Sequence, residues 1–129
     1  MGLTTAGVNH LLGLGLGEAL TTFANANANL GVGGGAGGTT AFSIAQTDLQ
    51  GASKLRKACD ATFPSRAANV ITSKATFATG DANFTWDEFA LFNAASTGIM
   101  LHRGVSAAFF VKNSSTVAVL TVTLTVTAA

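Results

Sequence analysis

The chain has 129 residues, of which 48% are hydrophobic and 10% are charged, and its formal net charge at pH 7 is +1. This length suits one domain, and the balanced charge excludes a basic nucleic-acid-binding protein and an electrostatic membrane-binding protein. Soluble domains typically carry about 25% charged residues, so a free monomer would expose an unusually apolar surface. We therefore expect a partner, or further copies of the chain, to cover that surface.

The first predicted element is a helix near the amino end. Thr4 or Thr5 can cap it, and apolar or small residues recur at helical spacing: Val8, Leu11, Leu12, Gly15, Leu16, Ala19 and Leu20. Each glycine in a helix interior destabilises it by about 1 kcal/mol relative to alanine, so packing has to support this helix. Glycines on one face also admit another backbone closely, which predicts a subunit contact at Gly13, Gly15 and Gly17.

The same amino-terminal stretch carries no convincing targeting signal. It lacks a basic region, and Asn9 and His10 precede its apolar part. Its longest apolar run is far below the roughly 20 residues that span a bilayer. These features predict a protein that is made in the cytoplasm and does not span a membrane.

Residues 25–38 read NANANLGVGGGAGG, which raises the question of a phosphate-binding loop. Gly33, Gly35 and Gly38 satisfy a G-x-G-x-x-G count, but a P-loop continues with Lys and Ser or Thr, and here Thr39 and Thr40 follow. A lone glycine match is weak. We interpret the segment as a turn that uses positive φ angles and close packing. This interpretation makes three of its glycines candidate assembly contacts: Gly33, Gly35 and Gly37.

On either side of the glycines we predict a short strand around Leu30 and Val32 and then a helix over Thr47–Ala61 (TDLQGASKLRKACDA). Thr47 is a plausible N-cap residue with Gln50 in the capping-box position, and Pro64 would follow the helix end. The only basic cluster lies on it: Lys54, Arg56 and Lys57. No aromatic residues are interleaved with these charges, so we interpret them as a solvated face and not as a phosphate-binding patch.

Cys59 is the single cysteine. It cannot close an intrachain disulfide, and no Cys or His stands at metal-ligand spacing from it. A buried thiol that packs as a small apolar group is one interpretation, and an interchain disulfide in an assembly is the other.

From residue 69 onward the apolar period changes to two, which predicts strands. The predicted strands cover residues 69–78, 84–93, 99–103, 106–112 and 117–127, with a turn over 93–98. In the last strand, VAVLTVTLTVT, an apolar face alternates with a threonine face, as in a half-exposed antiparallel sheet. Its threonines are further candidate assembly contacts: Thr121, Thr123 and Thr125. The predicted fold is mainly β with amino-terminal helical segments (α+β), one domain over residues 1–129 that comprises a helical and glycine-rich portion (1–64) and an antiparallel, β-sandwich-like portion (65–129).

The sequence offers little for catalysis, and we predict no enzyme, cofactor or metal. His10 and His102 have no second His or carboxylate at ligand spacing. Asp81, Asn83, Thr85 and Asp87 occupy alternate positions of a calcium loop, but its sixth position requires glycine and holds Trp86. Alternating polar and aromatic residues fit a strand better.

The ordered segments from Asn25 to Arg103 resemble a family of small virion proteins of tailed bacteriophages. The pattern is carried by the Asn-Ala stretch, the glycine-rich turn, TAF, QTDLQ, the Lys/Arg segment, DATFP, ANFTWDE, FNA and MLHR. EFALFNAASTGIMLHR also resembles a strand-turn-strand element of phage tail-fibre and collar proteins. The resemblance implies a non-enzymatic structural part of a virion, assembled in the cytoplasm of the host bacterium.

Three functions remain open at this stage. The first is a capsid decoration, or cement, subunit that binds the major capsid protein and self-associates, preferably as a trimer. The second is a tail, collar or fibre-attachment subunit. The third is a receptor- or carbohydrate-binding module that uses Trp86 and the phenylalanines, although aromatic residues at period two more often build a core.

Overall fold

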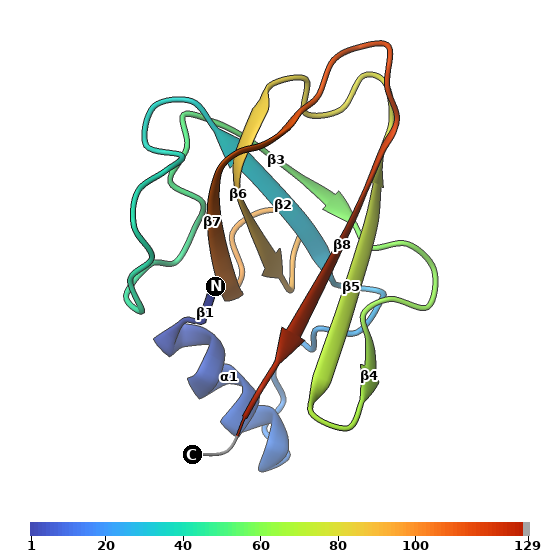
Figure 1. Ribbon diagram of the computed structural model, residues 1–129. Coiled ribbons are helices and arrows are strands. Elements are labelled where there is room, and N and C mark those ends of the chain that lie inside the picture. Colours follow the sequence, from blue (N-terminus) through green and yellow to red (C-terminus); the bar gives the residue numbers. More distant parts are fainter. Residues whose placement is uncertain (128–129) are drawn as a thin grey trace.

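The computed structural model describes residues 1–127 and shows a mainly β protein with one amino-terminal helix (Figure 1). The helix α1 spans Thr5–Gly15. The strands are β1 (Gly2–Leu3), β2 (Asn29–Gly34), β3 (Ser53–Ala58), β4 (Ser65–Ala67), β5 (Val70–Phe77), β6 (Thr85–Phe92), β7 (Met100–Val111) and β8 (Ala118–Thr125). This is the α+β, antiparallel and sandwich-like fold that the sequence predicts.

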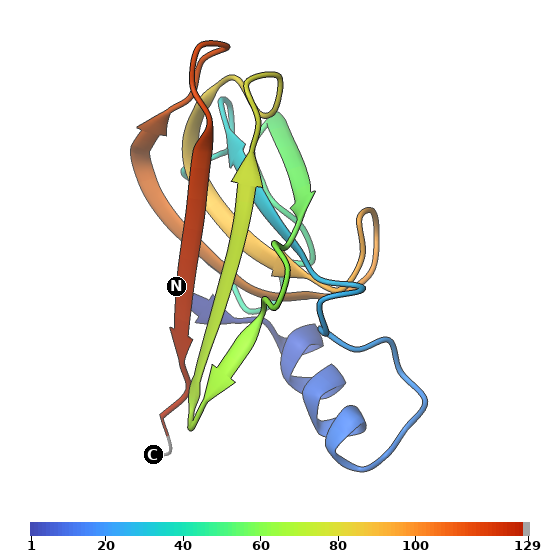
Figure 2. The same ribbon diagram turned by 90° about the vertical axis from the view of Figure 1, so that its right-hand side faces the viewer.

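The strands form two antiparallel sheets that pack face to face. One sheet has the order β1-β7-β6-β2-β3 and the other has the order β4-β5-β8. Figure 2 shows the two layers, with α1 at one end of the sandwich. The core between them combines side chains of both sheets, with Leu30 and Leu91 from the first and Phe77, Val122 and Leu124 from the second.

Trp86 lies at the centre of this core and is 2% exposed. Its ring centroid lies 5.0 Å from that of Phe77, 5.1 Å from that of Phe110 and 6.0 Å from that of Phe109. Its indole nitrogen donates to the carbonyl oxygen of Ala82 at 3.0 Å, which satisfies its one polar group. The aromatic residues therefore build the core, as their period of two indicates, and Trp86 has no free face for a sugar ring.

The helix α1 is joined to the first sheet through its amino end. Thr4 is the N-cap residue: its hydroxyl accepts from the backbone N–H of Gly7 at 2.9 Å and donates to the carbonyl oxygen of Met100 at 2.6 Å. Gly7 lies directly against β7, where a Cβ atom would stand 2.6 Å from the carbonyl oxygen of Leu101. The helix ends earlier than the predicted pattern, because the chain turns away at Gly17 with φ of +81°.

The predicted helix over Thr47–Ala61 is wrong. Residues 53–58 form β3, which pairs with β2 along its whole length from Asn29↔Ala58 to Gly34↔Ser53. Thr47 does not cap a helix, and the apolar residues that recur at helical spacing pack in two different clusters. Leu49 packs on the outer side of the first sheet, whereas Leu55 and Cys59 contact the central core. Pairing with a neighbouring strand has overridden a local pattern of period three to four.

Most of the later strands agree with the predicted ranges, and the turn over 93–98 joins β6 to β7. The two strands predicted over 99–103 and 106–112 are instead one strand, β7. Gly104 continues the strand because its missing side chain leaves room for the ring of Phe89. The irregularity comes later, at Ala108, where φ is +48° and the backbone N–H donates to Asp87 Oδ1 at 2.7 Å.

The predicted division at residues 64 and 65 does not separate two structural portions. β2 and β3 precede it, yet they belong to the same sheet as β6 and β7. The predicted domain also includes residues 128 and 129, which lie outside the described residues. β5 and β8, by contrast, show the alternation expected of them: Ala118, Val122 and Leu124 are buried, and Thr121 and Thr123 are exposed.

The half-exposed character of β8 gives a first prediction. Val122→Asp places an unpaired charge in the core between the sheets, which costs several kcal/mol. Thr123→Asp puts the same charge on the solvent side and should change the free energy of unfolding by less than about 1 kcal/mol. Denaturant unfolding of both variants at low protein concentration measures the difference. Equal losses would contradict the half-exposed placement of β8.

Candidate functional site

The glycine-rich segment turns the chain between β2 and a long connection to β3. Gly33 and Gly34 are the last residues of β2, and Gly35 and Gly37 have φ of +74° and +85°. Positive φ at these two positions is the conformational role that the sequence predicts. The connection that follows, residues 35–52, lies over the outer side of the first sheet, where Leu49 packs with Ala90, Phe92 and Met100.

A buried ion pair holds this connection on the sheet. Glu88 on β6 and Arg103 on β7 are both 0% exposed, and Arg103 Nε donates to Glu88 Oε1 at 2.7 Å. The Glu88 carboxylate also accepts from the backbone N–H groups of Gln50 at 2.9 Å and Gly51 at 2.5 Å. Arg103 Nη1 donates to the carbonyl oxygen of Thr40 at 2.9 Å and to Gln46 Oε1 at 3.1 Å.

This arrangement answers the question of a phosphate site. Gly33 faces the Glu88 carboxylate, which would collide with any side chain at that position. The backbone N–H groups that could receive an anion, those of Gln50 and Gly51, already bind that carboxylate. The negative charge of Glu88 would also repel a phosphate. Gly33 therefore serves the packing of an internal carboxylate.

Sequence reasoning missed Glu88 and Arg103. Each stands as a charged residue within a largely apolar strand, in FTWDEFALF and in MLHRGV. Charged residues are rarely fully buried unless they are paired. A charged residue within an apolar strand was therefore the available sign of a buried ion pair. The pairing itself follows from the register of β6 and β7, which places Ala90 opposite Arg103 and brings Glu88 onto the same side of the sheet.

The two histidines occupy different environments. Burial and the positive charge of the amino terminus lower the pKa of His102 to about 4, so the ring is neutral at pH 7. It is 1% exposed, and its Nδ1 has no hydrogen-bond partner among the described residues. His10 Nε2 lies 2.6 Å from the carbonyl oxygen of Thr21 and 3.2 Å from Asn93 Nδ2. These contacts tie the segment after α1 to the end of β6.

The polar residues from Asp81 to Asp87 do not converge on one point. Asp81 Oδ2 binds Lys57 Nζ at 2.6 Å, Asn83 Oδ1 accepts from Lys112 Nζ at 2.9 Å, and Asp87 Oδ1 accepts from a backbone N–H of β7. Within residues 1–127 no group of three or more His, Cys, Asp or Glu side chains has metal-binding geometry.

The basic cluster lies on β3, not on a helix, and its charges are paired. Lys54 and Arg56 bind Asp48 at 2.7 and 3.3 Å, and Lys57 binds Asp81. The Arg56 guanidinium also stacks 3.4 Å from the ring centroid of Phe92 and donates to two carbonyl oxygens of the 93–98 turn region. An open pocket of about 260 Å³ lies beside these residues, but its cations are already engaged.

Cys59 is buried at the end of β3 and is a free thiol. Burial raises the pKa of this thiol to about 11, so the reactive thiolate is scarce at pH 7. The structure places Cys59 where the small apolar interpretation expects it. The interchain disulfide stays a prediction, which this burial disfavours.

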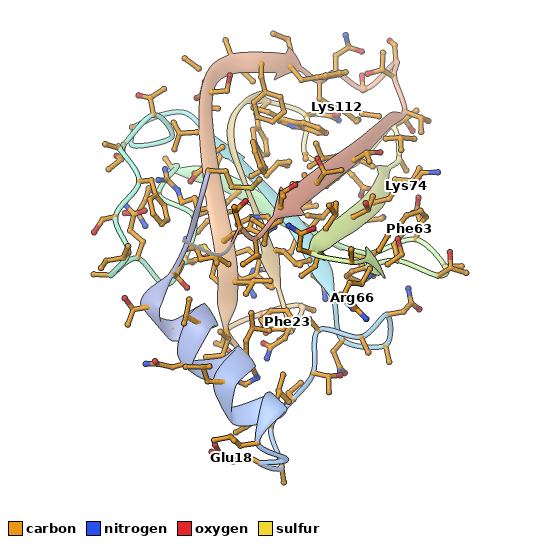
Figure 3. The ribbon with its side chains drawn as sticks, turned by 60° about the horizontal axis from the view of Figure 1, so that its bottom comes forward. Glu18, Phe23, Phe63, Arg66, Lys74 and Lys112 are labelled. Carbon is orange, nitrogen blue, oxygen red and sulfur yellow. The ribbon has the colours of Figure 1, made fainter. Side chains whose placement is uncertain are left out.

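An apolar groove of about 180 Å³ lies where α1 meets the two sheets. Leu91 and Leu101 are fully buried beside it, and Leu11, Phe23 and Ile71 complete most of its lining. Figure 3 shows Phe23 and Arg66 at this end of the molecule. The groove separates the inner face of α1 from β4, so the helix covers the end of the sandwich without closing it.

A row of exposed apolar side chains lies on the outer side of α1. Val8, Leu12 and Leu16 recur every four residues and are 37%, 63% and 83% exposed. Ile44, 62% exposed, lies beside Val8 near the amino end of α1, and its carbonyl oxygen accepts from the N–H of Thr5 at 2.9 Å. A groove of about 210 Å³ runs between Ile44 and α1. We call Val8, Leu12, Leu16 and Ile44 the α1 stripe.

The predicted assembly contacts separate into internal and external positions. A Cβ atom at Gly13 would meet Leu20, at Gly33 it would meet Glu88, and at Gly37 it would meet the carbonyl oxygen of Gln50. Gly13 and Gly33 are buried against their own chain, whereas Gly35 and Gly37 are exposed beside it. The subunit contacts predicted at these four glycines stay predictions. The remaining predicted positions face open space or are exposed: Gly15, Gly17, Thr121, Thr123 and Thr125.

Comparison with known proteins returned no family model, no curated protein and no solved structure that matches this chain. In residues 1–127 no helix combines the length and the apolar character that crossing a bilayer requires.

The Gly33–Glu88 contact gives a second prediction. Gly33→Ala forces a methyl group against a carboxylate that Arg103 and two backbone N–H groups hold in place, and such overpacking costs about 1–3 kcal/mol. Gly80→Ala is the control, because open space surrounds that position, and it should stay within about 0.5 kcal/mol of the parent. Thermal or denaturant unfolding measures both. Identical stability of the two variants would contradict the packing role of Gly33.

His102 gives a third prediction. Its pKa is about 4 in the folded protein and about 6.5 in the unfolded chain, so the unfolded state binds more protons between these values. The contribution of the neutral, buried His102 ring to the free energy of unfolding is fully present above pH 6.5. It decreases by about 3 kcal/mol in total as the pH falls toward 4. Urea unfolding at a series of pH values measures this slope. His102→Leu should flatten the slope in that window, and an unchanged slope would contradict the assignment.

Proposed function

We propose that this chain is a non-enzymatic structural subunit of a tailed-bacteriophage virion, namely a capsid decoration subunit. The observation that carries the proposal is the α1 stripe. A helix that is apolar on both its inner and outer sides is normally buried on both, and the outer side of α1 is open in the isolated chain. A surface of this kind is typical of a protein that works in contact with others.

Two further features support an assembly role. The exposed apolar side chains also include Val111, Val117 and Val119. They belong to the end of β7, the start of β8 and the connection between them, which lies at the end of the sandwich away from α1 (Figure 1). Several of the ionic groups that a catalytic site could use are engaged in internal pairs, such as Glu88 with Arg103. The resemblance of residues 25–103 to small virion proteins gives the assembly its biological setting, with the major capsid protein as the proposed neighbour.

A tail, collar or fibre-attachment subunit is the second candidate. It is favoured by the strand-turn-strand element that the sequence resembles, which here is β6, the 93–98 turn and β7. Quantitative mass spectrometry of purified virions separates the candidates. Hundreds of copies per particle indicate the head lattice, a handful indicate the tail or collar, and absence from the virion contradicts both.

A fourth prediction concerns the α1 stripe. Leu12→Glu places a charge at the centre of the stripe, and burying it in a contact without a partner costs several kcal/mol. A loss of about 3 kcal/mol corresponds to a more than hundredfold weaker association. Size-exclusion chromatography with light scattering measures the change as a smaller oligomer at the same concentration.

The matched control is Thr79→Glu, which adds the same charge at an exposed turn between β5 and β6. It should leave the association unchanged. A parent protein that remains a stable monomer at tens of micromolar, or equal effects of both variants, would count against the α1 stripe as a contact.

A further inference from the structure

β8 is the edge strand of the three-stranded sheet. It pairs with β5 over its full length, from Val70↔Thr125 to Phe77↔Ala118. In residues 1–127 no strand pairs with its other side. Figures 1 and 2 show β5 along one side of β8 only. An eight-residue edge of this kind can template the pairing of another strand.

The hydrogen bond beyond the end of the ladder shows which backbone groups face the open edge. The N–H of Val126 donates to the carbonyl oxygen of Asn69 at 2.9 Å, one step past the pair Val70↔Thr125. Hydrogen-bonded and non-hydrogen-bonded pairs alternate along an antiparallel ladder. The even-numbered residues of β8 therefore bond to β5. The odd-numbered residues direct their N–H and C=O groups to the open edge: Val119, Thr121, Thr123 and Thr125.

The other long edges carry features that oppose pairing with a second copy. β3 has three basic residues within six positions, Lys54, Arg56 and Lys57, which share only two carboxylates, Asp48 and Asp81. The excess positive charge would face its own copy across a pair of strands, which is destabilising. β7 is uncharged beyond its contact with β1, but it is irregular at Ala108, whose N–H is bound by Asp87. Such irregularities turn an edge away from a partner.

The remaining edges are too short or charged. β1 has two residues, and β4 has three, including Arg66. β8 differs from all of these, because its sequence AVLTVTLT contains no charge, no proline and no glycine. Its β-branched residues suit a strand that is paired on both sides. Charge and regularity therefore select β8 as the edge at which two identical chains can meet without repulsion.

We propose that β8 pairs antiparallel with β8 of a second copy of this chain and joins two three-stranded sheets into one of six strands. The inference rests on the proposed assembly role, whose partner it names. Side chains of one face must oppose side chains of the same face, so odd-numbered residues lie opposite odd-numbered residues. Two registers meet this condition: in one, Thr121 lies opposite Thr121 of the second copy, and in the other, Val122 lies opposite Val122 of the second copy. Thr123 lies within the paired region in both.

The pairing is closed by a two-fold axis, because each strand uses its only free edge. It involves a surface separate from the α1 stripe. The two contacts use separate parts of the chain and can be removed one at a time. Loss of the α1 contact should therefore leave a dimer.

The test uses Thr123→Pro in the Leu12→Glu background. Proline at position 123 removes an N–H that faces the open edge and leaves the ladder to β5 intact, a position at which edge strands tolerate proline. We expect Leu12→Glu to be a dimer by light scattering and the double variant to be a monomer with the same β-sheet circular dichroism. Leu12→Glu with Thr123→Val keeps the edge N–H and should remain a dimer.

Amide hydrogen exchange on the unmodified protein gives a second readout that needs no variant. The N–H groups of Val119, Thr121 and Thr123 should exchange at least tenfold more slowly at high than at low protein concentration. The N–H groups of Leu120 and Val122, which bond to β5, should change less. Concentration-independent exchange at the odd-numbered positions, or a Leu12→Glu protein that is already monomeric, would overturn the pairing.

These outcomes are distinct from those that test the proposed function. A protein that enters virions in many copies but associates without β8 would refute the strand pairing and leave the assembly role standing. A protein absent from virions that still forms the β8 dimer would refute the virion role alone. Protection of the odd-numbered amides only when a different virion protein is added would show that the edge pairs with that protein, which also overturns pairing between copies.

Discussion

The structure depends on one buried ion pair, between Glu88 and Arg103. Removing two charges from water costs several kcal/mol per ion, and only close pairing with further hydrogen bonds offsets this cost. Here the carboxylate receives two backbone N–H groups in addition to the guanidinium, and the guanidinium reaches Thr40 and Gln46. The pair therefore fixes a long connection with little regular structure to the face of a sheet, where Leu49 completes a second apolar cluster.

The same pair affects the outer surface. The chain has only seven basic and six acidic residues, and Glu88 and Arg103 are withdrawn entirely from solvent, as is most of Lys112. Some of the charged side chains that remain at the surface form ion pairs with each other, such as Lys57 with Asp81. The exposed surface is thus less charged than the composition alone suggests. This connects the internal architecture to the apolar α1 stripe and to the uncharged edge of β8.

The sequence predicts the strands well where one face is buried and the other is wet, because period two then appears directly in the residues. β8 and β5 are examples. The sequence also predicts the positive φ angles of Gly35 and Gly37. The prediction fails over Thr47–Ala61, where a strand pairs with β2 in spite of apolar spacing typical of a helix.

The candidate site was only partly accessible from the sequence. The threonines of β8 can be recognised as exposed from their alternation. By contrast, the neighbour of a glycine cannot be read from the glycine itself. Gly33 faces a carboxylate from a strand 55 positions away, and that contact exists only after β2 and β6 have paired. The exposure of Leu12 and Leu16 likewise depends on which side of α1 meets Leu101.

The position of β1 has a consequence for folding. Gly2 and Leu3 pair with Arg103 and His102, and the Thr4 hydroxyl bonds to Met100. The two strands of this pair are thus separated by about one hundred residues of chain. Contacts of such high sequence separation slow folding. Completion of the first sheet, and with it the seating of Gly7 of α1 against Leu101, therefore has to wait for β7 to take its place.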